Sequence, residues 1–175
     1  MNLLSFDSSN DLFIDSLHAA RNSNPNDILH RLSRPKGESK HELKKIIESR
    51  QSSDNFYYFI ELDSSDASSQ IAGTVQAIWS DQVSRTVEIG ILIYKGYQGK
   101  GLGKKAILMF LDKLALEFAV RKCFVRILSS NQKSINLFQS IGFKKCGCLT
   151  KHFYMNRTLL YPRLTVVKRF KKYEM

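Results

Sequence analysis

This chain has no long apolar run and no signal-like N-terminus, and its number of cysteines is small and odd. Its longest unbroken apolar stretch runs from Ala106 to Leu111, whereas a helix needs about 20 apolar residues to cross a bilayer. The first residues contain neither a basic segment nor a sustained apolar one, so we expect no secretory signal and no membrane association. The chain has three cysteines, and an odd number without a signal is typical of reduced thiols in the cytoplasm.

A metal site is also not expected. Cys146 and Cys148 are one residue apart, but no second pair of cysteines or histidines stands at ligand spacing, and His152 is isolated. The remaining composition, with 43% apolar and 25% charged residues over 175 positions, is ordinary for a soluble globular protein. A chain of this length forms one well-buried domain, and we expect a single domain over residues 1–175.

The charge of the chain is strongly asymmetric. Residues 1–87 carry 9 basic and 12 acidic residues, whereas residues 88–175 carry 18 and 4, which leaves the second half at +14. This charge is compatible with a plain solvated surface, and it would also attract a multiply phosphorylated ligand. Nucleic acid is disfavoured as a partner, because the basic residues are dispersed through amphipathic segments, apart from those between Lys168 and Lys172.

Hydrophobic periodicity and capping residues predict helices and strands along the whole chain. Ser39 and Glu42 form a capping box at the start of one helix, and Asn131 and Gly142 bound another. Helices are predicted at 11–21, after Ser39, after residue 103 and between Asn131 and Gly142, with a weaker segment at 28–32, and strands at 56–62, 71–79, 86–94, 123–128, 143–150 and 164–170. This order predicts one mixed α/β layer.

Four of the nine glycines lie close together, at Gly96, Gly99, Gly101 and Gly103. The cluster stands between a strand-like run and a helical run, so it forms a loop at the start of a helix. Backbone N–H groups at that end of a helix are free and carry partial positive charge, which suits an anionic group. Lysines within and after the cluster add mobile positive charge. The sequence therefore predicts a pyrophosphate-binding loop.

Two common phosphate-binding motifs do not explain this loop. A Walker A loop needs glycine at the position of Gln98 and serine or threonine at the position of Lys105. A dinucleotide fingerprint does match from Gly101 to Ala106, but it requires an acidic residue near the end of the next strand, where Leu128 is followed by two serines. A nucleotide-binding domain of either kind is therefore disfavoured.

A third motif, Q/R-x-x-G-x-G/A, is met from Gln98 to Gly103, and a second block, N-x-x-A/S-x-x-x-Y/F-x-x-x-G-F, is met from Asn131 to Phe143. With both blocks in order and separated by a helix and a strand, the chain resembles the GNAT superfamily of N-acetyltransferases over roughly residues 70–170. It is similar to the branch of spermidine and ribosomal-protein alanine acetyltransferases. An unrelated α/β domain with a glycine-capped helix is the alternative.

The resemblance implies a fold and a division of roles along the chain. The family fold is a single α/β domain with a mixed, mostly antiparallel sheet, whose central strands splay apart and which helices flank. Residues 1–55 would supply helices on the acceptor side, and residues 56–175 the sheet and the acetyl-CoA-binding core. The N-terminal helices, the loop before the fourth strand and the segment 150–158 would select the acceptor.

The resemblance also implies acetyl-CoA as the co-substrate. Loop amides would bind its diphosphate, the fourth strand would run along its pantetheine arm, and the N–H of Ile91 would polarise the thioester carbonyl. The family's proton-donating tyrosine is replaced by Phe138, which is more simply a core residue. The residues implied in cofactor binding are Ile91, Leu92, Ile93, Gln98, Gly99, Lys100, Gly101, Leu102, Gly103, Lys104, Asn131 and Phe138.

The implied reaction is direct attack of an amine on the thioester carbonyl. An alkylammonium has a pKa near 10, so a base must remove its proton at neutral pH. Glu88 is the predicted base, since it matches an acidic position of spermidine acetyltransferases; the alternative is an exposed strand glutamate paired with a lysine. Ser134 is predicted to protonate the thiolate through water, with Tyr94, Tyr97 and Tyr154 as weaker substitutes.

We interpret the acceptor as a small-molecule amine, with a protein N-terminus as the alternative. An overall charge of +11 repels polyamines at long range. A non-catalytic acyl-CoA-binding member of the fold and a basic nucleic-acid-binding domain are the alternatives of another class, and a homodimer is left open. The acidic residues that could hold a polyamine are Asp7, Asp11, Asp15, Glu38, Glu42 and Glu48.

Overall fold

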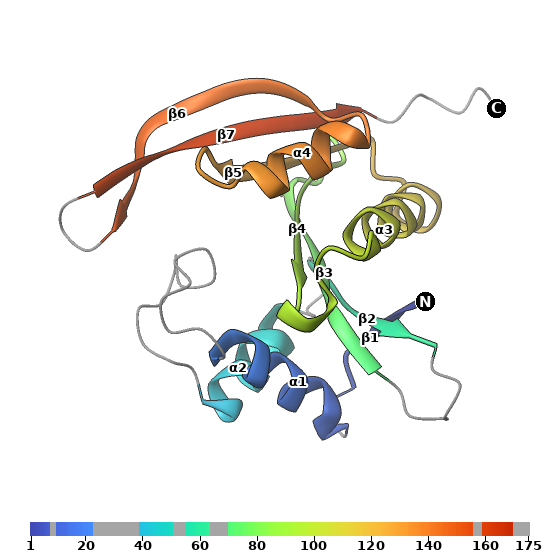
Figure 1. Ribbon diagram of the computed structural model, residues 1–175. Coiled ribbons are helices and arrows are strands. Elements are labelled where there is room, and N and C mark those ends of the chain that lie inside the picture. Colours follow the sequence, from blue (N-terminus) through green and yellow to red (C-terminus); the bar gives the residue numbers. More distant parts are fainter. Residues whose placement is uncertain (8–9, 23–38, 51–54, 64–69, 156–158, 170–175) are drawn as a thin grey trace. The chain divides into compact units, whose positions relative to one another are not determined.

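The computed structural model describes residues 1–7, 10–22, 39–50, 55–63, 70–155 and 159–169 (Figure 1). The weak helical segment predicted at 28–32 lies outside these residues, and every other predicted helix and strand is present. None of the helices in the described ranges is long and apolar enough to span a membrane. The elements are β1 (Asn2–Ser5), α1 (Asp11–Asn22), α2 (Lys40–Arg50), β2 (Asn55–Leu62), β3 (Gln70–Asp81), β4 (Thr86–Ile93), η1 (Lys95–Tyr97), α3 (Leu102–Phe118), β5 (Lys122–Leu128), α4 (Gln132–Ser140), β6 (Lys144–Met155) and β7 (Leu159–Arg169).

The strands form one mixed sheet of seven, in the order β1-β2-β3-β4-β5-β7-β6. β4 and β5 run parallel, whereas the β1–β2, β5–β7 and β6–β7 pairs are antiparallel. This sheet confirms the predicted α/β fold class. The chain forms two compact units: the first comprises Met1–Ala77 and Ile91–Ala106, and the second comprises Ile78–Gly90 and Ile107–Met175. The boundaries fall within β3, β4 and α3, so each unit holds part of β4.

The helices of the first unit begin where side chains replace missing backbone partners. The Oδ1 atom of Asn10 accepts a hydrogen bond of 3.0 Å from the Leu12 N–H at the start of α1. Ser39 and Glu42 form the predicted capping box before α2. The Ser39 Oγ accepts from the Glu42 N–H at 3.2 Å, and the Glu42 Oε2 accepts from the Ser39 N–H at 2.8 Å. These caps satisfy N–H groups that helix geometry leaves without intrahelical acceptors.

The core of the first unit joins α1 and α2 to the strands of that unit (Figure 1). The rings of Phe13 and Phe59 stack with centroids 4.6 Å apart, and the ring of Phe6 lies 6.0 Å from that of Phe59. Such aromatic pairs add stability beyond the area that they bury. Because Tyr94 belongs to this cluster, the core anchors the chain just before the glycine loop. Its buried members are Phe6, Phe13, Ile14, Leu17, Leu43, Ile47, Tyr57, Phe59, Ile71 and Tyr94.

In the second unit, α4 is closed at both ends as the sequence predicts. The Oδ1 atom of Asn131 accepts from the Ser134 N–H at 3.1 Å. At the other end Gly142 has a φ of +90°, and the Phe143 N–H donates to the Phe138 carbonyl at 3.0 Å. This pattern is a Schellman motif. The rings of Phe138 and Phe143 meet edge to face with centroids 5.1 Å apart, which is the apolar contact that usually accompanies the motif.

Side chains of β5 alternate between the two faces of the sheet. Cys123, Val125 and Ile127 are buried, whereas Phe124 is partly exposed and Arg126 is exposed. One face of β5 therefore belongs to the core of the second unit, and the other face can carry polar groups.

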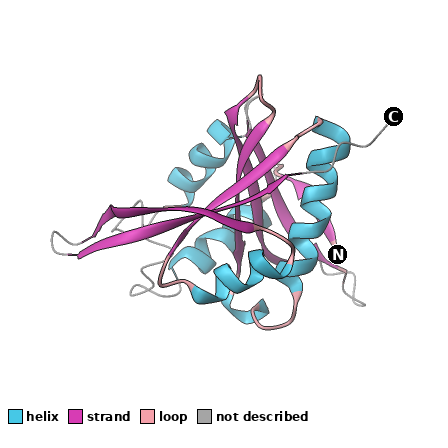
Figure 2. Cartoon of the chain, turned by 90° about the horizontal axis from the view of Figure 1, so that it is seen from above, coloured by secondary structure: helices cyan, strands magenta, loops and turns pink. Residues whose placement is uncertain are grey.

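β6 and β7 form an antiparallel ribbon, labelled in Figure 1 and seen from above in Figure 2. Its register shifts between Lys145 and Gly147 and again between Leu149 and Phe153. Shifts of this kind bend and twist a strand pair. Both strands are longer than predicted, because β6 continues to Met155 and β7 begins at Leu159.

Candidate functional site

The glycine loop leads directly into α3 within the first unit. The short 3₁₀ turn η1 follows β4, and α3 begins at Leu102. Between them, Gly99 and Gly101 adopt left-handed φ angles of +78° and +75°. The Lys105 N–H donates to the Gly101 carbonyl at 3.3 Å, which closes the first turn of the helix. The N–H groups of the residues before Lys105 therefore lack intrahelical acceptors and stand at the positive end of α3.

Backbone conformation explains the glycines at positions 99 and 101. A Cβ added to either residue would meet no heavy atom within 4 Å, so packing within the protein does not require glycine there. The positive φ does favour glycine, because a Cβ in this conformation crowds its own backbone. The space that a Cβ would occupy at both residues is open.

Positive side chains accompany these amides. Lys95, Lys100, Lys104 and Lys105 lie in or next to the loop, and all four are exposed. The Nζ atom of Lys100 lies 5.6 Å from the centre of the Tyr97 ring, which is a cation–π contact. The lysines add mobile charge to the fixed partial charge of the amides, as predicted for an anion-binding loop.

Gln98 joins the loop to the end of β4. Its Nε2 donates a hydrogen bond of 2.9 Å to the backbone carbonyl of Ile93, and its own N–H donates to the Lys95 carbonyl at 3.4 Å. Because the backbone N–H of Gln98 already has a partner inside the protein, the open backbone amides of the loop begin at Gly99. A contact between Gln98 and the cofactor stays a prediction.

Backbone geometry distinguishes the two edges of β4. The Tyr94 N–H donates to a carbonyl of β3 at 2.9 Å, and a Cβ on Gly73 of β3 would lie 2.2 Å from the Leu92 carbonyl oxygen. Leu92 and Tyr94 therefore turn their backbone groups toward β3. Since such groups alternate along a strand, those of Ile91 and Ile93 turn toward the opposite edge. This is the edge along which the family resemblance places the pantetheine arm.

Glu88, the predicted base, lies in the second unit and is held by Arg126 of β5. The Arg126 Nε donates to the Glu88 Oε1 at 2.8 Å, and the Arg126 Nη2 donates to the Glu88 Oε2. The Glu88 side chain is 27% exposed and the Arg126 side chain is 36% exposed. The hydrogen bonds that Arg126 donates to Glu88 raise the pKa of Arg126 above its usual value, so the guanidinium stays charged. An ion pair is therefore present, with arginine in place of the lysine that the sequence alternative invoked.

Strand register explains how Arg126, which no motif indicated, reaches Glu88. Within the described part of the second unit, the parallel register joins Thr86 to Lys122 and Glu88 to Phe124. Residues two apart on a strand share a face, so Arg126 stands on the same face as Phe124, beside Glu88. The basic residue within the predicted strand 123–128, whose other residues are apolar, was the available signal, but its partner could not be identified without the register.

The predicted residues of α4 fall on two sides of the helix. Asn131 is the N-cap residue, and its side-chain oxygen accepts a hydrogen bond from the Ser134 N–H. The Ser134 side chain is partly exposed. Phe138 is 1% exposed and packs on Phe143. The position of the family's tyrosine is thus filled by a residue of the core, in line with the simpler interpretation of the sequence. Cofactor contacts of these residues stay predictions.

The tyrosines considered as proton donors are poorly placed for that role or lie outside the described side chains. Tyr94 is 7% exposed, and burial raises the pKa of its hydroxyl above the usual value. A phenol of higher pKa is a weaker acid, so Tyr94 is poorly suited to protonate a thiolate. The Tyr97 hydroxyl donates to the Gln70 Oε1 at 3.4 Å. The side chain of Tyr154 is not among those described.

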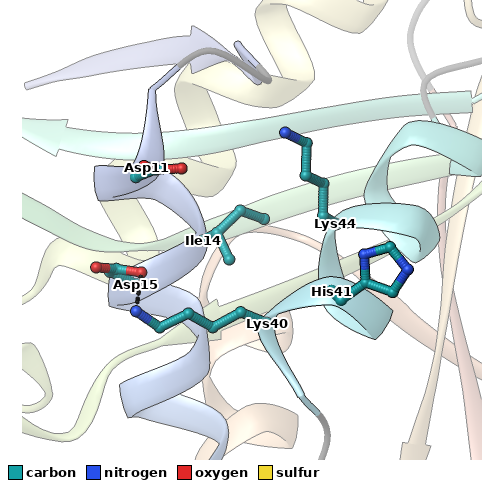
Figure 3. A pocket seen from close by; sticks show the side chains of 6 residues that line it. All are labelled: Asp11, Ile14, Asp15, Lys40, His41 and Lys44. Atoms are coloured by element: carbon teal, nitrogen blue, oxygen red, sulfur yellow. Dashed lines mark ion pairs between the residues drawn. The ribbon is translucent and has the colours of Figure 1, made fainter.

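An open pocket of about 210 Å³ lies between α1 and α2 (Figure 3). The Lys40 Nζ lies 2.7 Å from the Asp15 Oδ1 across this pocket. The pocket is therefore lined by both acidic and basic side chains. A polyamine site needs a cluster of carboxylates instead. Glu42 is used in the capping box, and Glu38 lies outside the described residues. The pocket is lined by Asp11, Ile14, Asp15, Lys40, His41 and Lys44.

Comparison with known sequences gives the family. The family model described as an acetyltransferase (GNAT) domain matches residues 10–144. The SPbeta prophage-derived uncharacterized N-acetyltransferase YokL of Bacillus subtilis is 30% identical over 149 residues, which cover 83% of this chain and 72% of that protein. The spermidine N(1)-acetyltransferase of Vibrio cholerae is 29% identical over 91 residues, 52% of this chain and 53% of that protein. The spermidine N(1)-acetyltransferase of Escherichia coli is 31% identical over 85 residues, 49% and 46% respectively. The chain thus spans about half the length of the curated spermidine acetyltransferases that it matches.

Solved structures share the fold. The crystal structure of spermidine N-acetyltransferase from Vibrio cholerae in complex with CoA and spermine matches with a TM-score of 0.81 at 23% identity, over 96% of this chain and 94% of that chain. This likeness confirms the predicted GNAT-type architecture, and the family model confirms the resemblance carried by the two sequence blocks. The chain therefore belongs to the GNAT family of N-acetyltransferases and is an acyltransferase.

Proposed function

We propose that this acyltransferase moves an acetyl group from acetyl-CoA to the primary amine of a small molecule by direct attack. The observation that carries the proposal is the glycine loop, whose amides from Gly99 into the first turn of α3 are open beside exposed lysines. A diphosphate is the anion that such a loop suits, and coenzyme A supplies one together with a 3′-phosphate. Relatives named as spermidine N(1)-acetyltransferases support an amine acceptor.

The residues present fit acetyl-CoA chemically. The amides between Gly99 and Lys104 would hold the diphosphate, and the lysines of the loop would add charge. The outward backbone groups of Ile91 and Ile93 would pair with the pantetheine amides as a neighbouring strand would. Acetyl-CoA supplies the activated acetyl group, and the Ile91 N–H would stabilise negative charge on the thioester oxygen. In this proposal residues 1–175 work as one cytoplasmic domain without a metal.

Glu88 would act on the amine. The amine nitrogen forms a bond to the thioester carbon, while the carbon–sulfur bond breaks and its electron pair leaves with the sulfur. An ammonium acceptor loses two protons in all: one passes through Glu88 to solvent, and the other ends on the thiolate. A carboxylate offers about four lone-pair sites, and Arg126 uses one on each oxygen. Glu88 therefore keeps the capacity to accept from the amine or from an intervening water.

The departing thiolate would be protonated without a tyrosine, because Phe138 is a buried core residue. A thiol of this type has a pKa near 8.5, so its thiolate is a tolerable leaving group at neutral pH. Ser134 lies partly exposed in the first turn of α4. Its hydroxyl would pass a proton to the sulfur through water.

The acceptor would be selected by the pocket between α1 and α2. Several ammonium groups of a polyamine would meet Lys40 and Lys44 as well as the carboxylates of Asp11 and Asp15. A smaller amine that also carries an anionic or polar group matches this mixed lining better. A protein N-terminus is the competing acceptor class.

Two measurements test the proposal in sequence. Acetyl-CoA at about 100 times its Kd should stabilise the folded protein by about 2.7 kcal/mol, which raises Tm by several degrees.

Release of free coenzyme A would then be followed with polyamines, amino sugars, amino acids and peptides. Turnover with a small amine is expected. Turnover with peptides alone would identify a protein N-terminal acetyltransferase, and stabilisation without any turnover would identify a non-catalytic member. Tight, salt-dependent nucleic-acid binding without stabilisation by acetyl-CoA would contradict the proposal altogether.

A further inference from the structure

We infer that Arg126 is a positioning residue for acetyl transfer, which holds the Glu88 carboxylate in one orientation so that Glu88 can take the acceptor's proton. The inference rests on the proposed function. Arg126 itself touches neither the acceptor nor the thioester in this scheme and acts through Glu88. Its evidence is the fork of two hydrogen bonds that joins the two side chains.

The fork restricts Glu88 more than a single contact would. A guanidinium is planar and presents parallel N–H donors that match the two oxygens of a carboxylate. The Nε and Nη2 atoms of Arg126 each reach a different oxygen of Glu88. The plane of the carboxylate is therefore fixed, and its remaining lone pairs keep a constant direction. A free glutamate would sample several rotamers and lose entropy on adopting the productive one.

Among the register neighbours on β5 and β7, Arg126 is the cation placed beside the Glu88 carboxylate. Across β7, the register partners of Phe124 and Arg126 are Val167 and Thr165, which carry no charge. Lys122, the preceding basic residue on that face of β5, is in register with Thr86 and not with Glu88. The orientation of Glu88 therefore depends on a single arginine among these neighbours on β5 and β7.

Because Glu88 and Arg126 are partly exposed, an effect of their ion pair on the reaction rate can be distinguished from an effect on folding stability. Both side chains keep about a third of their surface in solvent, and ion pairs this exposed add little to stability. Loss of the pair should therefore leave Tm almost unchanged. An effect on turnover would then reflect the position of Glu88 rather than a damaged fold.

Three single variants of the full chain test the inference, with kcat, the KM values of acetyl-CoA and amine, and Tm measured for each. Arg126→Gln should lower kcat about tenfold or more and leave the KM for acetyl-CoA unchanged. The expected loss is part of the rate acceleration of about 10²–10⁴-fold that general base catalysis provides. Arg126→Lys keeps the charge but cannot form the fork, so it should recover part of the loss. Lys122→Gln, on the same strand and face, is the matched charge control and should keep kcat within about twofold.

A double variant shows whether Arg126 acts through Glu88. If it does, Arg126→Gln should slow the Glu88→Gln enzyme no further, because interacting residues are non-additive. Arg126→Gln with unchanged or raised kcat would overturn the inference, as would a full additional loss in the double variant. Absence of turnover by the unaltered protein with every amine would overturn the proposed function and this inference together, whereas turnover by the unaltered protein that survives Arg126→Gln overturns the inference alone.

Discussion

The side-chain amide of Gln98 donates a hydrogen bond of 2.9 Å to the backbone carbonyl of Ile93, so the glycine loop is bonded to the last residue of β4. Ile93 belongs to the strand edge that turns away from β3. The bond therefore fixes the loop relative to this edge within the first unit, independently of any ligand. Arginine, the other residue that the motif allows at this position, is also a long side chain that donates N–H groups.

Gln98→Leu should weaken binding of acetyl-CoA about fivefold, because the loss of a neutral hydrogen bond costs about 1 kcal/mol. Gln98→Arg keeps N–H donors and should restore most of the affinity. Isothermal titration with acetyl-CoA measures the difference, and Gln139→Leu, which changes an exposed glutamine of α4, is the control. An unchanged Kd for Gln98→Leu would show that the loop holds its shape without this bond.

Gly101 offers a direct test of the loop as the diphosphate site. Gly101→Ala should destabilise the fold by about 1 kcal/mol because of its left-handed φ. Gly96→Ala is the matched control, since Gly96 also has open space but no positive φ. Gly101→Glu would add a negative charge where an anion is expected to bind, so it should weaken acetyl-CoA binding far more than Gly101→Ala. Equal affinity of Gly101→Glu and the unaltered protein would remove the assignment.

Gly73 is required for a different reason, which is the close approach of β3 to β4. A Cβ there would lie 2.2 Å from the Leu92 carbonyl oxygen, so one strand would have to move. Gly73→Ala should lower the free energy of unfolding by about 2–3 kcal/mol, as overpacking does. Urea denaturation measures the loss, with Gly147→Ala as the control because open space surrounds Gly147. Similar midpoints for the two variants would contradict the close approach.

Features set by neighbouring residues were predictable from the sequence. The capping box of Ser39 and Glu42, the N-cap at Asn131 and the positive φ of Gly142 depend on side chains and backbone within one turn of a helix. The glycine loop was predictable for the same reason, because its conformation and its open amides follow from local spacing. These features were sufficient to give the fold class and the start of α3 with its open backbone amides.

Features set by strand register were not predictable. β1 is short, and its residues are held by antiparallel pairing with β2, from Asn2↔Glu61 to Ser5↔Tyr58. The ion pair of Glu88 and Arg126 joins residues 38 positions apart. One sequence gives hydrophobic alternation along each strand but not the offset between two strands, so the partner of Glu88 could be anticipated only as some cation.

Glu88→Gln tests the base itself through its pH dependence. Glutamine keeps the shape of the side chain and one acceptor oxygen for Arg126, but it cannot take a proton from the acceptor. At pH 7 an amine of pKa near 10 is almost entirely protonated, and its free fraction rises about a hundredfold by pH 9. The need for a base therefore falls as the pH rises toward the pKa of the amine.

The loss of kcat/KM in Glu88→Gln should accordingly be large at pH 7, within the range of about 10²–10⁴ that general base catalysis provides, and clearly smaller at pH 9. Initial rates at both pH values, with the amine held below its KM, measure this difference. Glu48→Gln, which removes an exposed carboxylate from α2, controls for charge and should show no pH-dependent loss. An equal loss at pH 7 and pH 9 would mean that Glu88 does not deprotonate the acceptor, and the Glu88–Arg126 pair would then stabilise charge or shape in the second unit without taking part in proton transfer.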